Sequence, residues 1–186
     1  MLSKPPIYDV PAEGYDQLYG REQLEKYELI ALNLRKLLTD VKNVLDVGCA
    51  TSLFGEYLHA VGYDGLYIGI DVDLDRLKIA KSKLGERLML IQADAHNLPI
   101  RDRAVDFAAC ITVIHLLDVE RALMELFRVS KKLIAVTLLK KRLDLKPKLL
   151  KIFSSMSRSW SLKYLSVHRV KDEIFILEKV KEECRL

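Results

Sequence analysis

The chain has 186 residues, of which 50% are hydrophobic and 30% are charged, so it is long enough for one domain with a sizeable core. Its apolar runs are shorter than the roughly 18 residues of a membrane span, and its start lacks the apolar block of a signal peptide. Because the three cysteines (Cys49, Cys110 and Cys184) are too far apart for a metal-ligand pair or a disulfide framework, we expect a cytoplasmic protein without a membrane or metal partner.

The net charge of +4 is unevenly distributed. Residues 1–130 hold 15 Lys and Arg against 20 Asp and Glu, whereas residues 131–186 hold 15 against 6. The basic excess of the C-terminal third indicates either an anionic partner or a solvated basic face, and the sequence leaves both open.

Helical and strand patterns alternate after an irregular arm, residues 1–20, that is rich in Pro, Gly and Tyr. Apolar spacing predicts a helix over 21–39. The elements predicted after it are strands at 43–48, 65–71, 88–94, 105–114 and 132–139, and helices at 52–62, 74–85 and 119–130. Ser52 is the expected N-cap of the helix at 52–62, and Gly62 is its expected stop.

The last part of the chain has a different pattern. A helix is predicted over 143–158, with Pro147 in or near its first turn, followed by strands at 161–170 and 173–180 joined by a short Lys-Asp turn. The fold class is therefore α/β, a doubly wound, mostly parallel sheet with an antiparallel C-terminal hairpin. Within the single domain we expect an arm and helix (1–40), a core (43–139) and a basic C-terminal part (140–186).

The predicted strand 43–48 ends in an acid and a glycine. In open α/β sheets, ligands bind beyond the carboxyl ends of the strands, and Gly48 permits a sharp turn there. However, Gly48, Ala50 and Leu53 match the dinucleotide pattern G-x-G-x-x-G poorly. Asp46 would repel a pyrophosphate, but it would favour the ammonium and sulfonium of S-adenosylmethionine.

The next two predicted strands end in acids as well, Asp71 and Asp94. Asp71 is placed to accept hydrogen bonds from both hydroxyls of a ribose, or to cap the following helix, a role that Asp73 can also fill. Val72 is placed to pack on an adenine face. Asp94 can accept a hydrogen bond from the adenine amine, and the N–H of Ala95 can donate to a ring nitrogen.

With these acids, residues 43–139 resemble the class I S-adenosylmethionine-dependent methyltransferases. VLDVGCATS is similar to the first motif VLDVGCGTG, IGIDVD to the second-strand motif, and QADAHNLPIRDRAVDFAACITVIHLLD to the stretch that leads into the fourth strand. VIHLLDVERALMELFRVSKK resembles LHHLPDPEKALREIARVLKPGG of the ubiquinone-methyltransferase-like branch. The resemblance implies seven strands, the last antiparallel, and S-adenosylmethionine as cofactor. It also implies cofactor contacts from Asp46, Gly48, Cys49, Ala50, Asp71, Val72, Asp94, Ala95 and, through its backbone, Ile111.

The sequence departs from the family pattern in the first loop. Ala50 and Ser52 stand where the family has glycines. Because alanine favours a negative φ, we expect the loop to take a path compatible with that angle. A chain that binds the cofactor without catalysing transfer is the non-catalytic alternative.

The reacting groups are less clearly marked. His115 matches a histidine-bearing position of the family pattern, which implies a general base or a substrate contact. It can equally be a packed, hydrogen-bonded histidine. Cys110 is expected to be a core residue rather than a nucleophile. No N/D-P-P-Y motif follows the fourth strand, which argues against amino-group methylation by that route.

The methyl acceptor is not determined by the sequence. Tyrosines of the arm and first helix can cover the cofactor, stack on a flat substrate or pack on the helix; they are Tyr8, Tyr15, Tyr19 and Tyr27. YDQLYGREQLEKY loosely resembles segments of rRNA guanine-N7 enzymes, which implies a possible small activator protein on an edge strand. RNA is slightly favoured because aromatic and basic residues interleave in the C-terminal third, namely Trp160, Tyr164, His168 and Arg169. The alternative is a small metabolite, since the chain is short and lacks an added recognition domain.

Overall fold

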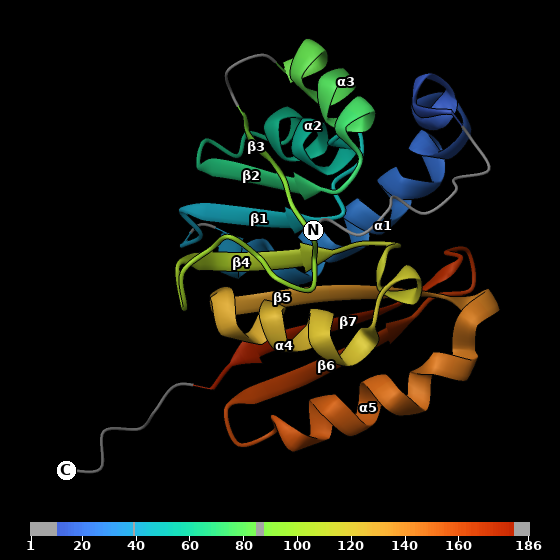
Figure 1. The fold of residues 1–186 in the computed structure, drawn as a ribbon. Helices are drawn as coiled ribbons and strands as arrows, with labels where there is room; N and C mark the ends of the chain where they lie inside the picture. Colours follow the sequence, from blue (N-terminus) through green and yellow to red (C-terminus); the bar gives the residue numbers. More distant parts are fainter. Residues whose placement is uncertain (1–10, 39, 85–87, 181–186) are drawn as a thin grey trace.

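The computed structural model describes residues 11–38, 40–84 and 88–180, which form a seven-stranded sheet between two layers of helices (Figure 1). The strand order is β3-β2-β1-β4-β5-β7-β6. The strands are β1 (Asn43–Val47), β2 (Leu66–Asp71), β3 (Leu88–Gln92), β4 (Val105–Cys110), β5 (Ser130–Leu139), β6 (Trp160–Ser166) and β7 (Asp172–Lys179). The first five are parallel, and β7 is antiparallel to both β5 and β6. This arrangement confirms the predicted fold class.

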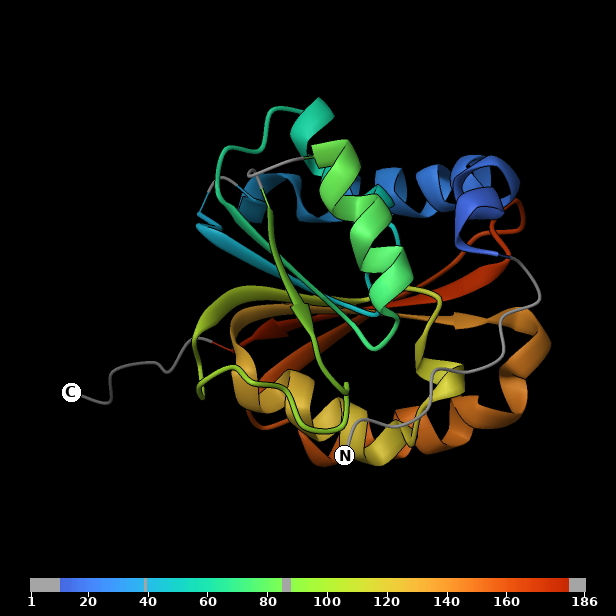
Figure 2. The ribbon, with the colours of Figure 1, turned by 45° about the horizontal axis from the view of Figure 1, so that its top comes forward.

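Helices cover both faces of the sheet (Figure 2). One face carries α1 (Tyr15–Leu38), α2 (Leu53–Ala60) and α3 (Leu74–Leu84), and the other carries α4 (Val119–Val129) and α5 (Lys146–Ser155). Short 3-10 helices lie at Ala12–Gly14, Ile114–Leu116 and Lys140–Leu145. Every side chain of the central strand β4 is buried, as expected for a strand covered on both faces.

The sheet separates two apolar clusters. On the α1–α2 side, Tyr27 and Ile30 of α1 and Phe54 of α2 pack over Val44 and Phe107. On the other side, the buried residues of α4 recur at three- and four-residue spacing, which gives the helix one apolar stripe; they are Val119, Ala122, Leu123, Leu126, Phe127 and Val129.

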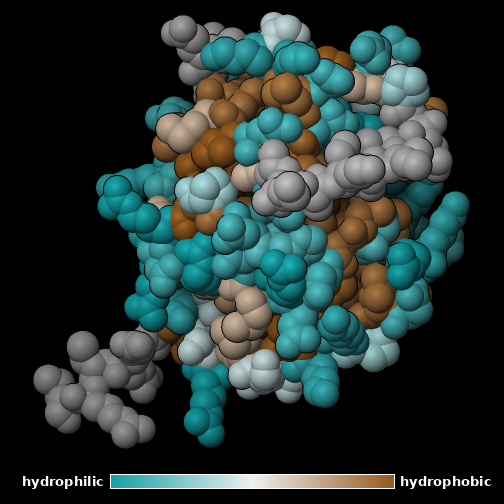
Figure 3. All heavy atoms as spheres, in the orientation of Figure 1, coloured by the Kyte–Doolittle hydropathy of each residue, from teal (hydrophilic) through white to brown (hydrophobic). Residues whose placement is uncertain are grey.

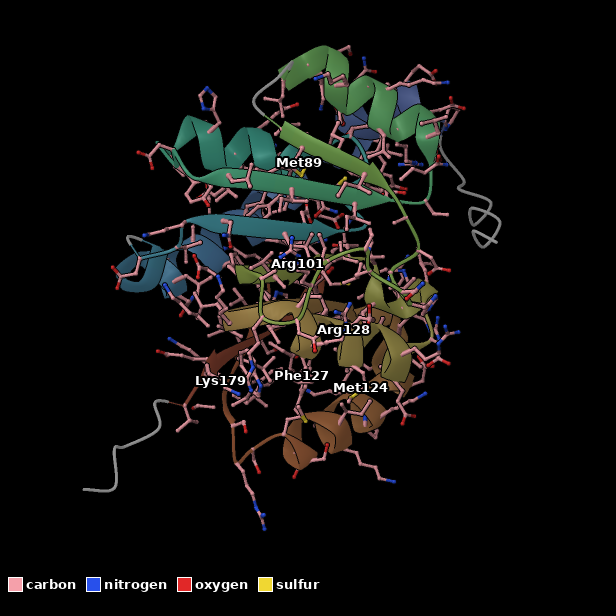
Figure 4. The ribbon with its side chains drawn as sticks, turned by 60° about the vertical axis from the view of Figure 1, so that its left-hand side comes forward. Met89, Arg101, Met124, Phe127, Arg128 and Lys179 are labelled. Carbon is pink, nitrogen blue, oxygen red and sulfur yellow. The ribbon has the colours of Figure 1, made fainter. Side chains whose placement is uncertain are left out.

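The loop before β4 is fixed by α4. Arg128 donates to the carbonyls of Leu98 and Ile100 and pairs with Asp102 and Glu125 (Figure 4). These bonds hold a segment without helix or strand against α4. They explain how residues 98–102 are ordered although their sequence has no regular periodicity.

Three features were predicted in the N-terminal part: the start of α1, the cap of α2 and the end of α2. The helix predicted from residue 21 begins at Tyr15, so the expectation of an irregular arm was wrong for residues 12–20. The earlier start is held by tertiary contacts: Asp16 accepts from the hydroxyl of Thr51 and pairs with Lys83. Ser52 is the N-cap residue of α2 as predicted, but with φ +60° its side chain makes no capping hydrogen bond. Gly62, at φ +86°, ends α2 as predicted.

The C-terminal boundaries also differ from the pattern. The strand predicted over 105–114 ends at Cys110, because the chain turns at Thr112 into a 3-10 helix. The hairpin of β6 and β7 and the placement of Pro147 in the first turn of α5 are confirmed. The connection between the strands is residues 167–171, however, and not the predicted Lys-Asp turn, since Asp172 is the fully buried first residue of β7.

The outer strands of the sheet are β3 and β6. Hydrophobic residues gather around the β2–β3 edge on the face seen in Figure 3, where Leu66 and Met89 are exposed. A strand at either edge offers unpaired backbone groups to another chain. The activator protein that the arm's resemblance implies stays a prediction.

The structure also bears on the expectations about membrane helices, metal ligands and cysteines. Within 11–38, 40–84 and 88–180, no helix is both long and apolar enough to cross a membrane, and these same residues hold no cluster of three potential metal ligands. Cys49 and Cys110 are buried free thiols. Cys184, Tyr8 and Gly85 lie outside the described residues.

Candidate functional site

A cavity of about 800 Å³ opens at the carboxyl edge of the sheet. It lies beside the ends of β1 and β4, the adjacent strands at which the strand order reverses, which is where open α/β sheets bind ligands. Its volume is within the range of small-molecule sites. Seven predicted site residues line it, namely Gly48, Ala50, Asp71, Val72, Asp94, Ala95 and His115.

The loop after β1 runs in left-handed backbone geometry. Gly48, Ala50 and Ser52 have φ angles of +76°, +47° and +60°. The expectation that Ala50 adopts a negative φ was therefore wrong. The loop is held by its surroundings, because the N–H of Ala50 donates to Asp71 (2.8 Å) and the N–H of Gly48 donates to the carbonyl of Ile70 (2.7 Å).

Gly48 is required by a close approach as well as by its backbone angle. A Cβ at this position would lie 2.5 Å from a methyl carbon of Val113, which lines the same cavity. The loop after β1 and the loop after β4 therefore meet at Gly48. Any larger residue would push them apart.

Asp71 is a buried acceptor at the end of β2. One of its oxygens accepts from the N–H of Ala50, and the other accepts from the N–H of Asp73 at 2.9 Å. Burial raises the pKa of this carboxyl above its usual value. The cap of α3 is made by Asp73, which accepts from the N–H groups of Asp75 and Arg76. Asp71 therefore does not cap α3. Each of its oxygens accepts from one N–H group and can accept one further hydrogen bond.

Asp94 also lines the cavity, and it contacts His96, a histidine that the sequence pattern did not single out. One Asp94 oxygen accepts from the backbone N–H of His96 (2.9 Å) and lies 2.6 Å from its Nδ1. The His96 Nε2 accepts from the N–H of Asp118 (2.9 Å), so the ring is fixed with Nδ1 facing Asp94. Asp94 therefore lies at the cavity wall with its carboxyl group held by the turn at His96.

Three residues expected at the site do not line the cavity. Asp46 is buried beneath the loop and accepts from the hydroxyl of Tyr67 at 2.6 Å, and burial raises its pKa to about 7. Burial also raises the pKa of the Cys49 thiol. The side chain of Ile111 belongs to the apolar cluster under α1. Cys110 is a core residue as expected, since it is fully buried within β4.

Aromatic and cationic groups cover the cavity from α1 and α3. Tyr15 and Tyr19 line it, and the buried guanidinium of Arg76 lies 4.6 Å from the centroid of the Tyr15 ring. Tyr27 packs instead on Phe54 in the core, with ring centroids 5.0 Å apart. Nothing in the sequence marks Arg76, because it is one of several charged residues in α3 and its burial depends on contacts with α1.

His115 lies at the opposite end of the cavity from the acids. It is half-buried, and its Nδ1 is buried without a hydrogen-bond partner among the described residues. Burial and, to a smaller extent, the cations of Arg142 and Lys26 lower its pKa below the usual value, against an opposing effect of Asp172. The imidazole is therefore neutral near pH 7 and able to accept a proton.

This end of the cavity is basic. Lysines and a histidine from the segments after β5 and before β7 line it, namely Lys140, Lys141, His168 and Lys171. Two residues of the expected RNA-contacting set have other roles. Trp160 is buried against Phe127, so it was wrongly expected at an interface, and the Tyr164 hydroxyl accepts from Lys146 at 2.7 Å.

Similarity to known proteins agrees with this geometry. A family model described as a methyltransferase domain matches residues 45–133. An uncharacterized protein of Methanocaldococcus jannaschii is 32% identical over 125 residues, which are 67% of this chain and 46% of that protein. A tRNA (carboxymethyluridine(34)-5-O)-methyltransferase of Arabidopsis thaliana is 37% identical over 92 residues, 47% of this chain and 21% of that protein.

A third relative acts on a different kind of acceptor. A demethylmenaquinone methyltransferase of Staphylococcus epidermidis is 28% identical over 131 residues, 67% of this chain and 54% of that protein. The chain spans about half the length of the first and third of these relatives and about a fifth of the Arabidopsis enzyme.

Solved structures share the fold. A possible S-adenosylmethionine-dependent methyltransferase of Methanococcus maripaludis has a TM-score of 0.69 at 18% identity, covering 93% of this chain and 94% of that one. The magnesium protoporphyrin IX methyltransferase of Synechocystis PCC 6803, crystallised with S-adenosylmethionine, has a TM-score of 0.67 at 15% identity, covering 86% of this chain and 80% of that one.

The left-handed geometry of Ala50 gives a test of the loop. Ala50→Gly removes the steric cost of a positive φ, about 1–2 kcal/mol, and adds the smaller entropy cost of glycine. We expect the free energy of unfolding to rise by about 0.5–1 kcal/mol in urea denaturation. The control Ala31→Gly, within right-handed α1, should lower it by a similar amount. Destabilisation by Ala50→Gly would show that the loop does not hold this angle in solution.

Proposed function

Because this chain belongs to the class I, Rossmann-like S-adenosylmethionine-dependent methyltransferases, we propose that it transfers the methyl group of that cofactor to RNA. The observation that carries the proposal is the division of one cavity into an acidic end, with Asp71 and Asp94, and a basic end, with Lys140 and Lys141. Arg76 and Glu22 line the cavity as well, and Glu22 pairs with Lys171. The acids suit a cationic cofactor, and the lysines suit an anionic acceptor.

The residues present fit the cofactor. Asp71 has an acceptor position left on each oxygen for the two ribose hydroxyls, and Asp94 offers a carboxyl oxygen to the adenine amine. Val72 and Ala95 line the space between them. Gly48 leaves room where a Cβ would collide with Val113. Asp46 lies one layer deeper, so its proposed effect on the cationic methionine end acts through space and not by contact.

When bound, S-adenosylmethionine supplies an electrophilic methyl group on a sulfonium. The chain's own contribution is to align the acceptor, which is worth roughly 7–11 kcal/mol of barrier in well-oriented systems, and to remove its proton where the acceptor is a hydroxyl. We assign that proton to His115, which lines the cavity as a neutral imidazole. Tyr15 and Tyr19 are placed to cover a flat acceptor.

A small-molecule acceptor is the second candidate. It is favoured by similarity to the demethylmenaquinone methyltransferase, whereas RNA is favoured by similarity to the tRNA methyltransferase and by the basic end of the cavity. A chain that binds the cofactor without transferring its methyl group is the non-catalytic alternative. Transfer of a labelled methyl group into separated RNA, protein and metabolite pools distinguishes the three.

Cofactor binding can be measured before the acceptor is known. At about 100 times its Kd, a ligand adds about 2.7 kcal/mol to the free energy of unfolding, and we expect this shift for S-adenosylmethionine in thermal melts. Asp71→Ala should remove most of it, since hydrogen bonds to a charged group are worth about 1.5–3 kcal/mol each. Asp73→Ala is the matched control: it loses the cap of α3, about 1 kcal/mol, but should keep the ligand-induced shift. Equal shifts in both variants would reject the ribose role of Asp71.

The role of His115 predicts a kinetic signature. His115→Ala should leave cofactor binding unchanged but lower kcat by about 10²–10⁴-fold for a hydroxyl acceptor, and His59→Ala, on the surface of α2, should not. Because burial lowers the pKa of His115, the base stays unprotonated as the pH falls through 6.5. The acidic limb of kcat/KM should therefore lie below pH 6.5, and a limb above that value would contradict the assignment.

The RNA assignment predicts a salt-dependent loss on charge reversal. Lys141 is exposed and lines the basic end of the cavity, so Lys141→Glu should weaken RNA binding and reduce the log–log salt slope by about 1 or more. Lys131→Glu makes the same charge change at the amino end of β5, the opposite edge of the sheet, and should have a smaller effect. Equal effects, or binding insensitive to salt, would favour a metabolite acceptor.

A further inference from the structure

A buried ion pair lies behind the basic end of the cavity. Lys26 of α1 and Asp172 of β7 have fully buried side chains, and Lys26 Nζ lies 3.0 Å from Asp172 Oδ1. Neither residue lines the cavity. Removing two charges from water is costly, and a buried pair is often no more stabilising than apolar residues of the same volume. Its presence here needs a reason other than stability.

The pair converges on Thr112, two residues after the end of β4. Lys26 Nζ donates to Thr112 Oγ1 (2.9 Å), and Thr112 Oγ1 donates to Asp172 Oδ2 (3.0 Å). The N–H of Thr112 donates to Thr137 Oγ1 (2.7 Å), which in turn donates to Asp172 Oδ2 (2.6 Å). Side chains from α1, β5 and β7 therefore fix both the backbone and the hydroxyl of one residue.

Thr112 is held in a backbone conformation that its side chain disfavours. Its φ is +60°, which is a genuine outlier for a β-branched residue. Such strain persists only where the surroundings over-determine it. The turn at Thr112 ends β4 and directs the chain into the 3-10 helix Ile114–Leu116. It thereby brings Val113 against Gly48 and places His115 in the cavity.

We propose that Lys26 and Asp172 are positioning residues, which hold Thr112 in its left-handed turn and so aim His115 at the acceptor. The inference rests on the proposed function, because it assumes that His115 works there as a base. Neither Lys26 nor Asp172 touches the acceptor in this scheme. They act through Thr112.

The two charges also act on His115 in opposite directions. Asp172 raises the pKa of His115 and Lys26 lowers it, as does Arg142, whose Nη1 donates to the His115 carbonyl. The other charged or titratable Asp, Glu, His, Lys and Arg residues around the cavity are unchanged in the variants below; they are Glu22, Asp71, Arg76, Asp94, His96, Lys140, Lys141, His168 and Lys171. Lys26→Met should therefore raise the pKa of His115, and Asp172→Asn should lower it.

The first experiment needs neither cofactor nor acceptor. Histidine-labelled full-length protein is titrated by NMR, with the His115 resonance identified by its loss in His115→Ala. Opposite shifts of the His115 pKa in Lys26→Met and Asp172→Asn are expected, and Lys26→Arg should restore the wild-type value. Lys132→Met is the matched control, because Lys132 pairs with Asp106 (3.5 Å) at the far edge of the sheet. Shifts of the same sign, or none, would overturn the proposal.

The second experiment measures turnover in the variants. A displacement of about 1 Å at a reacting group costs roughly 10²-fold in rate, so we expect kcat to fall by about that factor in Lys26→Met, in Asp172→Asn and in Thr112→Val. Binding of S-adenosylmethionine, measured by calorimetry, should change less than twofold. Lys132→Met should keep wild-type turnover. Wild-type kcat in the variants of the pair, with wild-type transfer intact, would refute the positioning role.

A double variant tests the proposal even if the single variants do not fold. Removing one partner leaves an uncompensated buried charge, whereas Lys26→Met together with Asp172→Asn removes both charges and nearly preserves volume. If the single variants unfold, the double variant decides: low kcat with retained cofactor binding supports the proposal, and wild-type kcat rejects it. A wild-type chain that transfers no methyl group would instead reject the proposed function, while the NMR titration still tests the coupling of Lys26 and Asp172 to His115.

Discussion

The arrangement of the site depends on carboxylates that are removed from water at one edge of a parallel sheet. Asp46 is the next-to-last residue of β1 and lies opposite Gly69, and Asp71 ends the neighbouring strand β2 two residues further along. Burial raises the pKa of both. Such groups are expensive to ionise without a nearby cation. A ligand with an ammonium and a sulfonium relieves this cost, whereas a pyrophosphate would add to it. The positive charge that these carboxyl groups favour in a ligand therefore distinguishes S-adenosylmethionine from a dinucleotide more sharply than the glycine pattern of the first loop does.

Much of this edge could be predicted from the chain. Apolar runs that end in Asp46 and Asp71 define strands, and parallel strands must bring their carboxyl ends together. The residues that were missed depend on tertiary contacts. His96 was within reach, because its spacing from Asp94 is that of an Asx turn. The positive φ of Thr112 could not be predicted, because side chains distant in sequence impose it. They are Lys26, Thr137 and Asp172, which lie 86, 25 and 60 residues away.

Strain is concentrated in the two loops that face each other across Gly48. Ala50 and Ser52 in one loop and Thr112 in the other have positive φ, at about 1–2 kcal/mol each. In the first loop, Asp71 holds the N–H of Ala50, so the residue proposed to bind the ribose also shapes the turn. In the second loop, Asp172 accepts from the hydroxyls of Thr112 and Thr137, and the Thr137 hydroxyl accepts from the N–H of Thr112. A buried carboxylate thus sets the backbone on each side of the cavity.

The buried carboxyl groups of Asp71 and Asp172 also explain how one cavity can have ends of opposite charge. The acids near the cofactor end bond backbone N–H groups of the loops around them, as Asp71 does with Ala50 and Asp73, and they offer acceptor oxygens to a cationic ligand. At the other end, Asp172 pairs with Lys26 inside the protein, and Glu22 pairs with both Lys26 and Lys171, so these acids are balanced by cations and leave Lys140 and Lys141 at the cavity wall. The buried pair therefore shapes the acceptor end without opposing an anionic acceptor. A lone buried acid at the position of Asp172 would fix the same turn but would weaken the attraction for RNA.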